Sequence, residues 1–105
     1  MSTKVCSLSA LISGTAQRVE LDSADIAVVR VGDEVFALED VCSHAEFPLT
    51  DGMVEDTTIE CALHGSQFDL RTGKPLSPPA TRPVRTYPVT VVDGDVYIDM
   101  ETESP

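Results

Sequence analysis

Apolar residues along the chain fall in short runs that alternate with polar positions, and no segment keeps the period of an amphipathic helix. Turn residues separate the runs. Two pairs of runs are each joined by a two-residue turn that contains Gly: 25–31 with 34–38 through Gly32-Asp33, and 89–92 with 95–98 through Asp93-Gly94. Such turns are typical of β-hairpins, so the pattern predicts an all-β fold.

Further strands are expected elsewhere. Residues 66–76 have the pattern of a third hairpin, in which Gly73 can take the positive φ that the turn requires. A short strand is predicted at 58–60, and the apolar run near the N-terminus resembles an edge strand. The prolines within 78–83 argue against a central strand there, because proline cannot donate to a sheet ladder.

Size and charge limit the function classes. With 105 residues and a mass of 11.3 kDa, we expect residues 1–105 to form one domain. The 18 acidic and 7 basic residues give a net charge of −11. Such a charge repels nucleic acid and attracts a basic protein surface, although it also serves simply to keep a small protein soluble.

The chain also carries few signs of export or membrane insertion. No run approaches the roughly 18 apolar residues that a membrane span requires. Three cysteines without a convincing export signal argue against a disulfide scaffold and favour a reducing compartment. We therefore expect a cytoplasmic protein that is not attached to a membrane.

Candidate chemistry is concentrated in two short boxes, Cys42-x-His44 and Cys61-x-x-His64, which contain both histidines and two of the three cysteines. Two ligands separated by one or two residues can bind the same metal ion or cluster from a single loop. Two such loops supply four ligands. Thiolate with imidazole indicates zinc or iron–sulfur chemistry.

Three other interpretations remain open. Each Cys or His taken singly has an ordinary structural explanation, as a small buried side chain or an exposed polar one. A nucleophilic Cys–His pair needs only one residue of each type. A structural zinc module acting as an interaction domain is the main alternative from a different class, although zinc usually prefers Cys-x2–4-Cys knuckles.

The two boxes resemble those of the Rieske family, whose pattern is C-x-H, a spacer and C-x-x-H. Here the spacer, 45–60, has 16 residues, and the resemblance covers most of the chain. The flanking residues that also match are Gly65, Phe68-Asp69 and Pro78-Pro79.

The resemblance implies a small antiparallel β-sandwich with a [2Fe–2S] cluster at the tip of two loops. It assigns Cys42 and Cys61 to the inner iron, and His44 and His64 to the outer iron. The implied role is one-electron transfer, with no catalytic residue in the chain. Two neutral imidazoles in place of two thiolates make the cluster easier to reduce than an all-cysteine cluster.

Three residues bear on the reduction potential. Respiratory and photosynthetic relatives carry an extra cysteine in each loop and a tyrosine nearby, whereas this chain has Phe47, Leu63 and Phe68 at those positions. The loops therefore cannot be joined by a disulfide, and Phe68 has no hydroxyl to donate. We predict a potential toward the negative end of the Rieske range of about −150 to +300 mV.

Other positions have supporting roles. Ser66 keeps a hydroxyl that could donate to a cluster sulfide or simply to the loop. Gly65 and Gly52 are interpreted as glycines that let the loops turn tightly. Pro78 is expected to cover the cluster, with a surface turn as the alternative. Cys6, outside both boxes, is expected to pack in the core.

Stand-alone chains of this length resemble the Rieske-type ferredoxins that carry electrons from a flavoprotein reductase to a ring-hydroxylating dioxygenase. Small Rieske-like proteins of iron–sulfur cluster assembly are a further alternative. We expect a monomer that docks briefly on its reductase and acceptor, because transient redox contacts are small, under about 1,200 Å².

Overall fold

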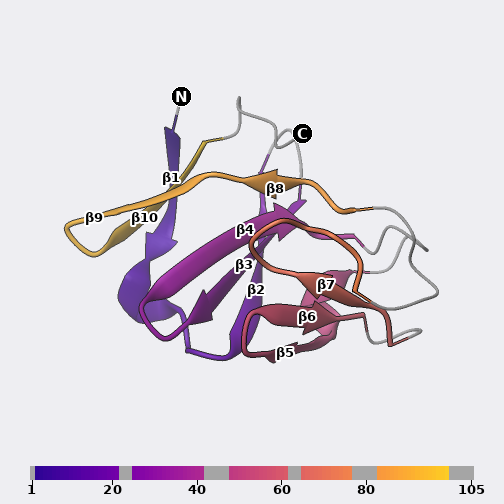
Figure 1. Ribbon diagram of the computed structural model, residues 1–105. Helices are drawn as coiled ribbons and strands as arrows, with labels where there is room; N and C mark the ends of the chain where they lie inside the picture. Colours follow the sequence, from indigo (N-terminus) through magenta and orange to yellow (C-terminus); the bar gives the residue numbers. More distant parts are fainter. Residues whose placement is uncertain (1, 22–24, 42–47, 62–64, 77–82, 100–105) are drawn as a thin grey trace.

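The computed structural model describes residues 2–21, 25–41, 48–61, 65–76 and 83–99. In these ranges the chain forms antiparallel β-strands and two short 3-10 helices, in agreement with the predicted all-β class (Figure 1). The helices are η1 (Leu8–Ala10) and η2 (Leu49–Asp51). No helix in the described ranges is long and apolar enough to cross a membrane.

The strands form three sheets. The terminal sheet has the order β1 (Ser2–Ser7), β10 (Asp95–Asp99), β9 (Val89–Val92). The central sheet has the order β2 (Thr15–Glu20), β3 (Asp25–Val31), β4 (Glu34–Glu39), β8 (Thr86–Tyr87). The small sheet has the order β5 (Met53–Glu55), β6 (Thr58–Glu60), β7 (Gln67–Asp69).

The two hairpins predicted from Gly-containing turns are confirmed. Strands β3 and β4 pair from Ile26 with Glu39 to Val31 with Glu34, and Gly32 has a φ of +61° in the turn. Strands β9 and β10 pair through a turn in which Asp93 and Gly94 both have positive φ. The N-terminal run is an edge strand, as expected, because β1 lies at one side of the terminal sheet.

The third predicted hairpin is only partly present. Gly73 takes a φ of +77°, as the sequence predicts. However, β7 finds its main partner in β6, and only a single bridge between Phe68 and Pro75 joins the two arms that were expected to pair. The preference for β6 follows from packing, since this pairing places Ile59 opposite Phe68 and both side chains are fully buried.

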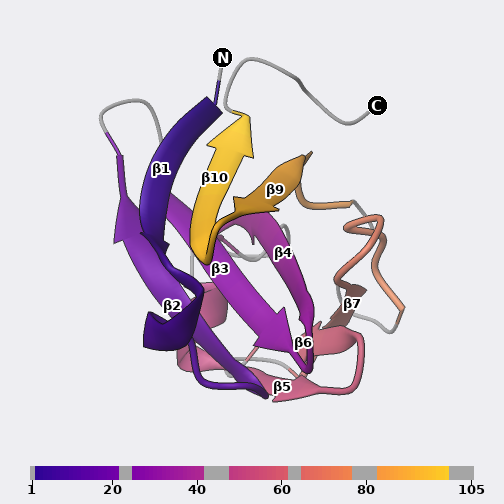
Figure 2. The same ribbon diagram turned by 90° about the vertical axis from the view of Figure 1, so that its left-hand side faces the viewer.

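The central sheet is covered on both faces because its buried residues alternate between two cores. On β3, Val28 contributes to the core shared with the terminal sheet, whereas Val29 contributes to the core shared with the small sheet. On β4, Ala37 and Leu38 divide in the same way. Figure 2 shows the terminal sheet lying over the central sheet, which gives the layered sandwich that the resemblance implied.

Candidate metal centre

Half of the eight predicted site residues lie in the described part of the chain. Four are described: Phe68 lies on β7 of the small sheet, and Cys61, Gly65 and Ser66 lie between β6 and β7. The other four lie outside the described residues: Cys42, His44, His64 and Pro78. The geometry of the site is therefore built from the segments that lead into and out of the two boxes.

The second box begins in a closed turn at the end of β6. Cys61 is fully buried and directly follows the last residue of that strand. Its backbone N–H donates to the carbonyl oxygen of Ser66 over 2.7 Å, and its carbonyl oxygen accepts from the N–H of Gly65 over 2.8 Å. These two hydrogen bonds fix both ends of the segment that contains His64.

The residues that follow this segment combine a positive φ at Gly65 with buried side chains at Ser66 and Phe68. Gly65 has a φ of +73°, so the prediction that a glycine is required here is confirmed. Ser66 and Phe68 are both fully buried, and Phe68 belongs to the core between the central and small sheets. A hydroxyl and an aromatic ring are thus buried close in sequence to Cys61, the ring on β7 and the hydroxyl on the residue directly before it.

Gly52 brings the segment that follows the first box against the residue that precedes the second box. A Cβ atom at Gly52 would lie 1.7 Å from the carbonyl oxygen of Glu60, the residue before Cys61. Pairing of Met53 with Glu60 in the β5–β6 ladder holds the two segments in this register. Gly52 has a φ of −89°, so the reason for glycine is close backbone approach rather than a left-handed turn.

Asp40 is a polar residue of the site region that the sequence did not single out. It directly follows β4 and lies two residues before Cys42. Its carboxylate accepts hydrogen bonds from the N–H and the hydroxyl of Thr50, each over 2.9 Å, and its side chain has no exposed surface. The signal was an acidic residue at the end of an apolar strand, adjoining a ligand box.

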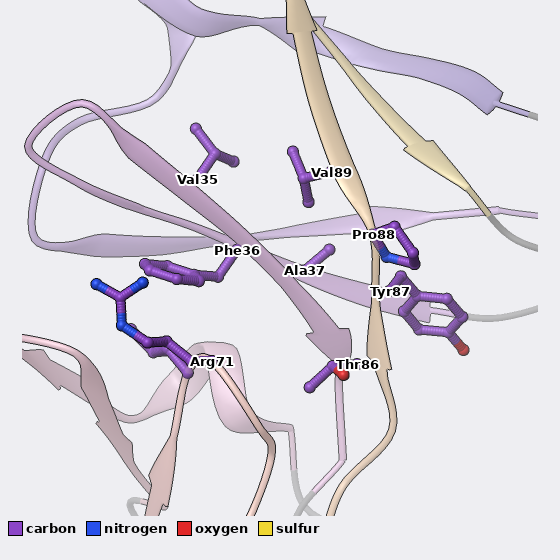
Figure 3. Close-up of a pocket in the computed structure, with 9 residues that line it drawn as sticks. Val35, Phe36, Ala37, Arg71, Thr86, Tyr87, Pro88 and Val89 are labelled. Carbon is purple, nitrogen blue, oxygen red and sulfur yellow. The ribbon is translucent and has the colours of Figure 1, made fainter. Parts of the chain in front are cut away.

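A second contact fixes the turn that follows β7. Arg71 donates two hydrogen bonds of 2.8 Å to the two carboxylate oxygens of Glu34, which lies at the start of β4. The guanidinium carbon also lies 5.3 Å from the centre of the Phe36 ring (Figure 3). These hydrogen bonds lower the pKa of Glu34 below its ordinary value.

Figure 3 shows a cleft lined by β4, β8, the start of β9 and the turn after β7, with Arg71 and Phe36 at one side and Tyr87 and Pro88 at the other. The cleft lacks a convergent set of metal ligands. Throughout the described residues, no group of three or more His, Cys, Asp or Glu side chains is placed to hold a metal ion. The two boxes therefore remain the candidate metal centre.

Cys6 differs from Cys61 in its surroundings. It lies on β1, half-buried, and packs against the core between the terminal and central sheets. Burial raises the pKa of its thiol, which disfavours the thiolate that metal binding needs. The expectation that Cys6 is a packing residue is confirmed.

Comparison with protein families decides between the interpretations of the two boxes. The model of the Rieske [2Fe-2S] domain matches residues 1–88, which include both boxes. The chain belongs to the Rieske family. The family's cofactor, a Rieske-type [2Fe–2S] cluster, is therefore the cofactor of this chain, and the structural zinc module is not favoured.

Relatives within the Rieske family are ferredoxin components. The chain is 46% identical over 100 residues to the 3-phenylpropionate/cinnamic acid dioxygenase ferredoxin subunit of Photorhabdus laumondii, covering 94% of each chain. It is 43% identical over 99 residues to the biphenyl 2,3-dioxygenase ferredoxin component of Rhodococcus jostii, covering 94% of this chain and 92% of the relative.

The same fold occurs in a chain of a solved protein complex. The model superposes with a TM-score of 0.88 and 41% identity on a chain from the complex of reduced oxygenase and oxidized ferredoxin in carbazole 1,9a-dioxygenase, covering 92% of this chain and 91% of that one. The predicted resemblance to soluble Rieske ferredoxins is thus confirmed in sequence and in fold.

The residues present fit a Rieske cluster. Such a cluster needs two thiolates and two imidazoles, and the two boxes supply that set. The one ligand candidate that the structure describes, Cys61, is buried at the end of a strand and is held by backbone hydrogen bonds. Burial of this kind excludes water from a thiolate ligand and tunes the metal centre.

Proposed function

We propose that the chain is the ferredoxin component of a ring-hydroxylating dioxygenase system. It accepts one electron from a flavoprotein reductase and delivers it to the terminal oxygenase. The observation that carries the proposal is the similarity over nearly the whole chain to dioxygenase ferredoxins, including one found in complex with its oxygenase. The chain itself transforms no substrate.

The proposed ligands are Cys42 and Cys61 for one iron, and His44 and His64 for the other. When bound, the cluster supplies a centre that takes up and releases one electron. The chain's own residues would hold it: the two thiolates would bind one iron and the two neutral imidazoles the other, so the site would carry less negative charge than one with four thiolates. The hydrogen bonds that join Cys61 to Gly65 and Ser66 support this assignment for the second box.

The neighbouring residues tune the site in this proposal. Ser66 donates a hydrogen bond toward the cluster, Gly65 permits the tight turn, and Pro78 shields the cluster. Phe68 contributes packing but has no hydroxyl to donate toward the cluster. Position 68 therefore does not help to stabilise the reduced state. We propose a midpoint potential toward the negative end of the Rieske range of about −150 to +300 mV.

The chain acts in the cytoplasm as a single Rieske domain of residues 1–105 and as a monomer in this proposal. Its net charge of −11 favours basic patches on the reductase and oxygenase and disfavours nucleic acid or an anionic membrane. A role in iron–sulfur cluster assembly is the alternative, and rapid transfer of the cluster to an apo acceptor would support it instead.

The ligand assignment is tested by cysteine substitution. We expect the purified protein to contain iron and acid-labile sulfide and to give a Rieske-type EPR signal when reduced. Cys61→Ser abolishes that signal, whereas the control Cys6→Ser retains it because Cys6 lies in the other core. A colourless wild-type protein that contains one zinc ion would overturn the assignment.

The carrier role is tested separately. The reduced protein is mixed anaerobically with the oxidised oxygenase of the 3-phenylpropionate dioxygenase system, whose ferredoxin is 46% identical to this chain. We expect reoxidation of the ferredoxin in this anaerobic mixture. In a separate aerobic assay that supplies O2, the aromatic substrate, the reductase and NADH, we expect product formation. A protein that holds its cluster but does not support turnover, with this oxygenase or with that of biphenyl dioxygenase, would contradict the role.

A further inference from the structure

The base of the first ligand box is closed by a buried polar contact. Asp40 and Thr50 lie at opposite ends of residues 41–49, the segment that contains Cys42 and His44. One carboxylate oxygen accepts from the N–H of Thr50, and the other accepts from its hydroxyl, each over 2.9 Å. The two ends of the segment are therefore joined by two charge-assisted hydrogen bonds.

The contact provides a hydrogen-bond acceptor for the backbone N–H of Thr50, which finds none within its own helix. Thr50 lies in η2, whose N-cap residue is Pro48 and provides no side-chain cap. A first-turn N–H of such a helix needs an acceptor from elsewhere. Asp40 supplies it from the end of β4, so the start of η2 is fixed to the central sheet.

Asp40 is itself held firmly. Its N–H donates to the carbonyl oxygen of Asp25 on β3 over 3.0 Å. Its side chain has no exposed surface, and a guanidinium nitrogen of Arg18 on β2 lies 3.7 Å from the carboxylate oxygen that accepts from the Thr50 hydroxyl. A buried carboxylate needs such partners to remain charged without a large desolvation cost. The contact between Asp40 and Thr50 is thus anchored to three strands of the central sheet.

The exit of the segment is fixed as well. After η2, Gly52 packs against the carbonyl of Glu60, which precedes Cys61. The Asp40–Thr50 contact and this close approach connect the two described ends of the first-box segment to Glu60, the residue before Cys61.

We propose that Asp40 is a positioning residue for the cluster. By holding Thr50, it sets the distance between the two ends of the segment 41–49, which contains the first box, so that Cys42 and His44 can bind the cluster together with the second box. The inference rests on the ligand assignment proposed above. It goes beyond that assignment by giving a function to a residue outside both boxes.

The test uses the holoprotein and four variants. Asp40→Ala removes both acceptors, and Thr50→Val removes only the hydroxyl donor without changing charge or shape. Thr50→Ser retains both donors and is the rescue variant. Asp25→Asn is the matched charge control, because Asp25 also pairs with Arg18 but does not contact Thr50.

The measurements are the rate of loss of the visible cluster absorption in excess chelator, and the g-values of the reduced protein. We expect Asp40→Ala to lose its cluster about tenfold faster than wild type, the lower end of the effect of removing a residue that orients a metal ligand. Thr50→Val should lose it at an intermediate rate and shift the g-values, whereas Thr50→Ser and Asp25→Asn behave like wild type.

Two results would overturn the proposal. In the first, Asp40→Ala and Thr50→Val keep the wild-type rate of cluster loss and the wild-type g-values. In the second, Asp25→Asn alters both as strongly as Asp40→Ala, which would assign the effect to charge. If Asp40→Ala does not fold, the comparison of Thr50→Val with Thr50→Ser in cluster loss and g-values tests the proposal by itself. Failure of the ligand assignment is distinct, because Cys61→Ser would then leave the wild-type EPR signal in place.

Discussion

Gly52 and the carbonyl group of Glu60 lie closer together than any residue with a Cβ atom would allow. The Cβ of an alanine at position 52 would lie 1.7 Å from the carbonyl oxygen of Glu60 and 3.1 Å from that of Leu49. Both neighbours are backbone atoms, which cannot rotate away as a side chain can. This contact couples Gly52, in the segment that follows the first ligand box, to Glu60, the residue before Cys61.

We therefore expect Gly52→Ala to be destabilising and to loosen the cluster. The β5–β6 hairpin must shift to admit the methyl group, at a cost of about 1–3 kcal/mol. Thermal unfolding followed by circular dichroism gives the loss of stability, and visible absorbance during chelation gives the loss of cluster.

Gly94→Ala is the matched control for this prediction. Gly94 has a φ of +79° but open space around its missing Cβ. Its replacement measures only the backbone penalty, about 1 kcal/mol, in a turn of the terminal sheet. A Gly52→Ala protein that is no less stable than Gly94→Ala and releases its cluster no faster would contradict the coupling.

Ser66 provides a prediction about the reduction potential. If its hydroxyl donates to a cluster sulfide, the bond is stronger in the reduced state, where the negative charge is larger. Ser66→Ala should then lower the midpoint by about 40 mV, equivalent to about 1 kcal/mol of differential hydrogen bonding in a one-electron couple. Redox titration followed by EPR measures the shift.

The control for Ser66 is Ser7→Ala, at the end of β1 in the terminal sheet. Its midpoint should equal that of the wild type. An unchanged midpoint in Ser66→Ala would show that the Ser66 hydroxyl serves the loop rather than the cluster.

The sequence predicted the ligand boxes and the main hairpins but not the contacts that join them. Hairpins are local, so Gly32 between two apolar runs was sufficient to predict β3 and β4. Strand β2 was not predicted because its residues are mostly exposed, and its sequence TAQRVE shows little alternation of apolar and polar residues. Its place in the sheet depends on pairing with β3.

The missed parts of the site are long-range as well. Asp40 and Thr50 are ten residues apart, and nothing local to either residue indicates that they meet. The sequence did predict a glycine requirement at Gly52, but as a tight turn. Its actual cause, the approach of Glu60, depends on the β5–β6 register, which is a tertiary property of the small sheet.

The pair of Arg71 and Glu34 predicts a dependence of stability on pH. The hydrogen bonds from Arg71 lower the folded-state pKa of Glu34 below its ordinary value of 4.5. The pair's contribution is therefore complete above that ordinary value and is lost as the pH falls through the lowered folded-state pKa. The effect should be small, because both side chains are about half exposed.

Glu34→Gln isolates this contribution. We expect the variant to melt slightly below wild type near neutral pH, and we expect the difference to disappear in acid, where Glu34 is protonated in both states. Glu55→Gln, an exposed glutamate on β5, serves as the control. A difference between wild type and Glu34→Gln that persists unchanged in acid would show that the effect comes from the placement of Arg71 over the Phe36 ring rather than from the charge of Glu34.

The acidic surface predicts how electron transfer responds to salt. With a net charge of −11, the protein is attracted over long range to basic patches on its reductase and oxygenase. Raising the ionic strength from about 0.01 to 0.1 M shortens the screening length from about 30 to 10 Å, so the bimolecular rate should fall. Stopped-flow reoxidation of the reduced ferredoxin by the oxygenase measures this rate. A rate that does not change with salt would exclude electrostatic steering while leaving the carrier role intact, because docking could then rest on the surface near the cluster alone.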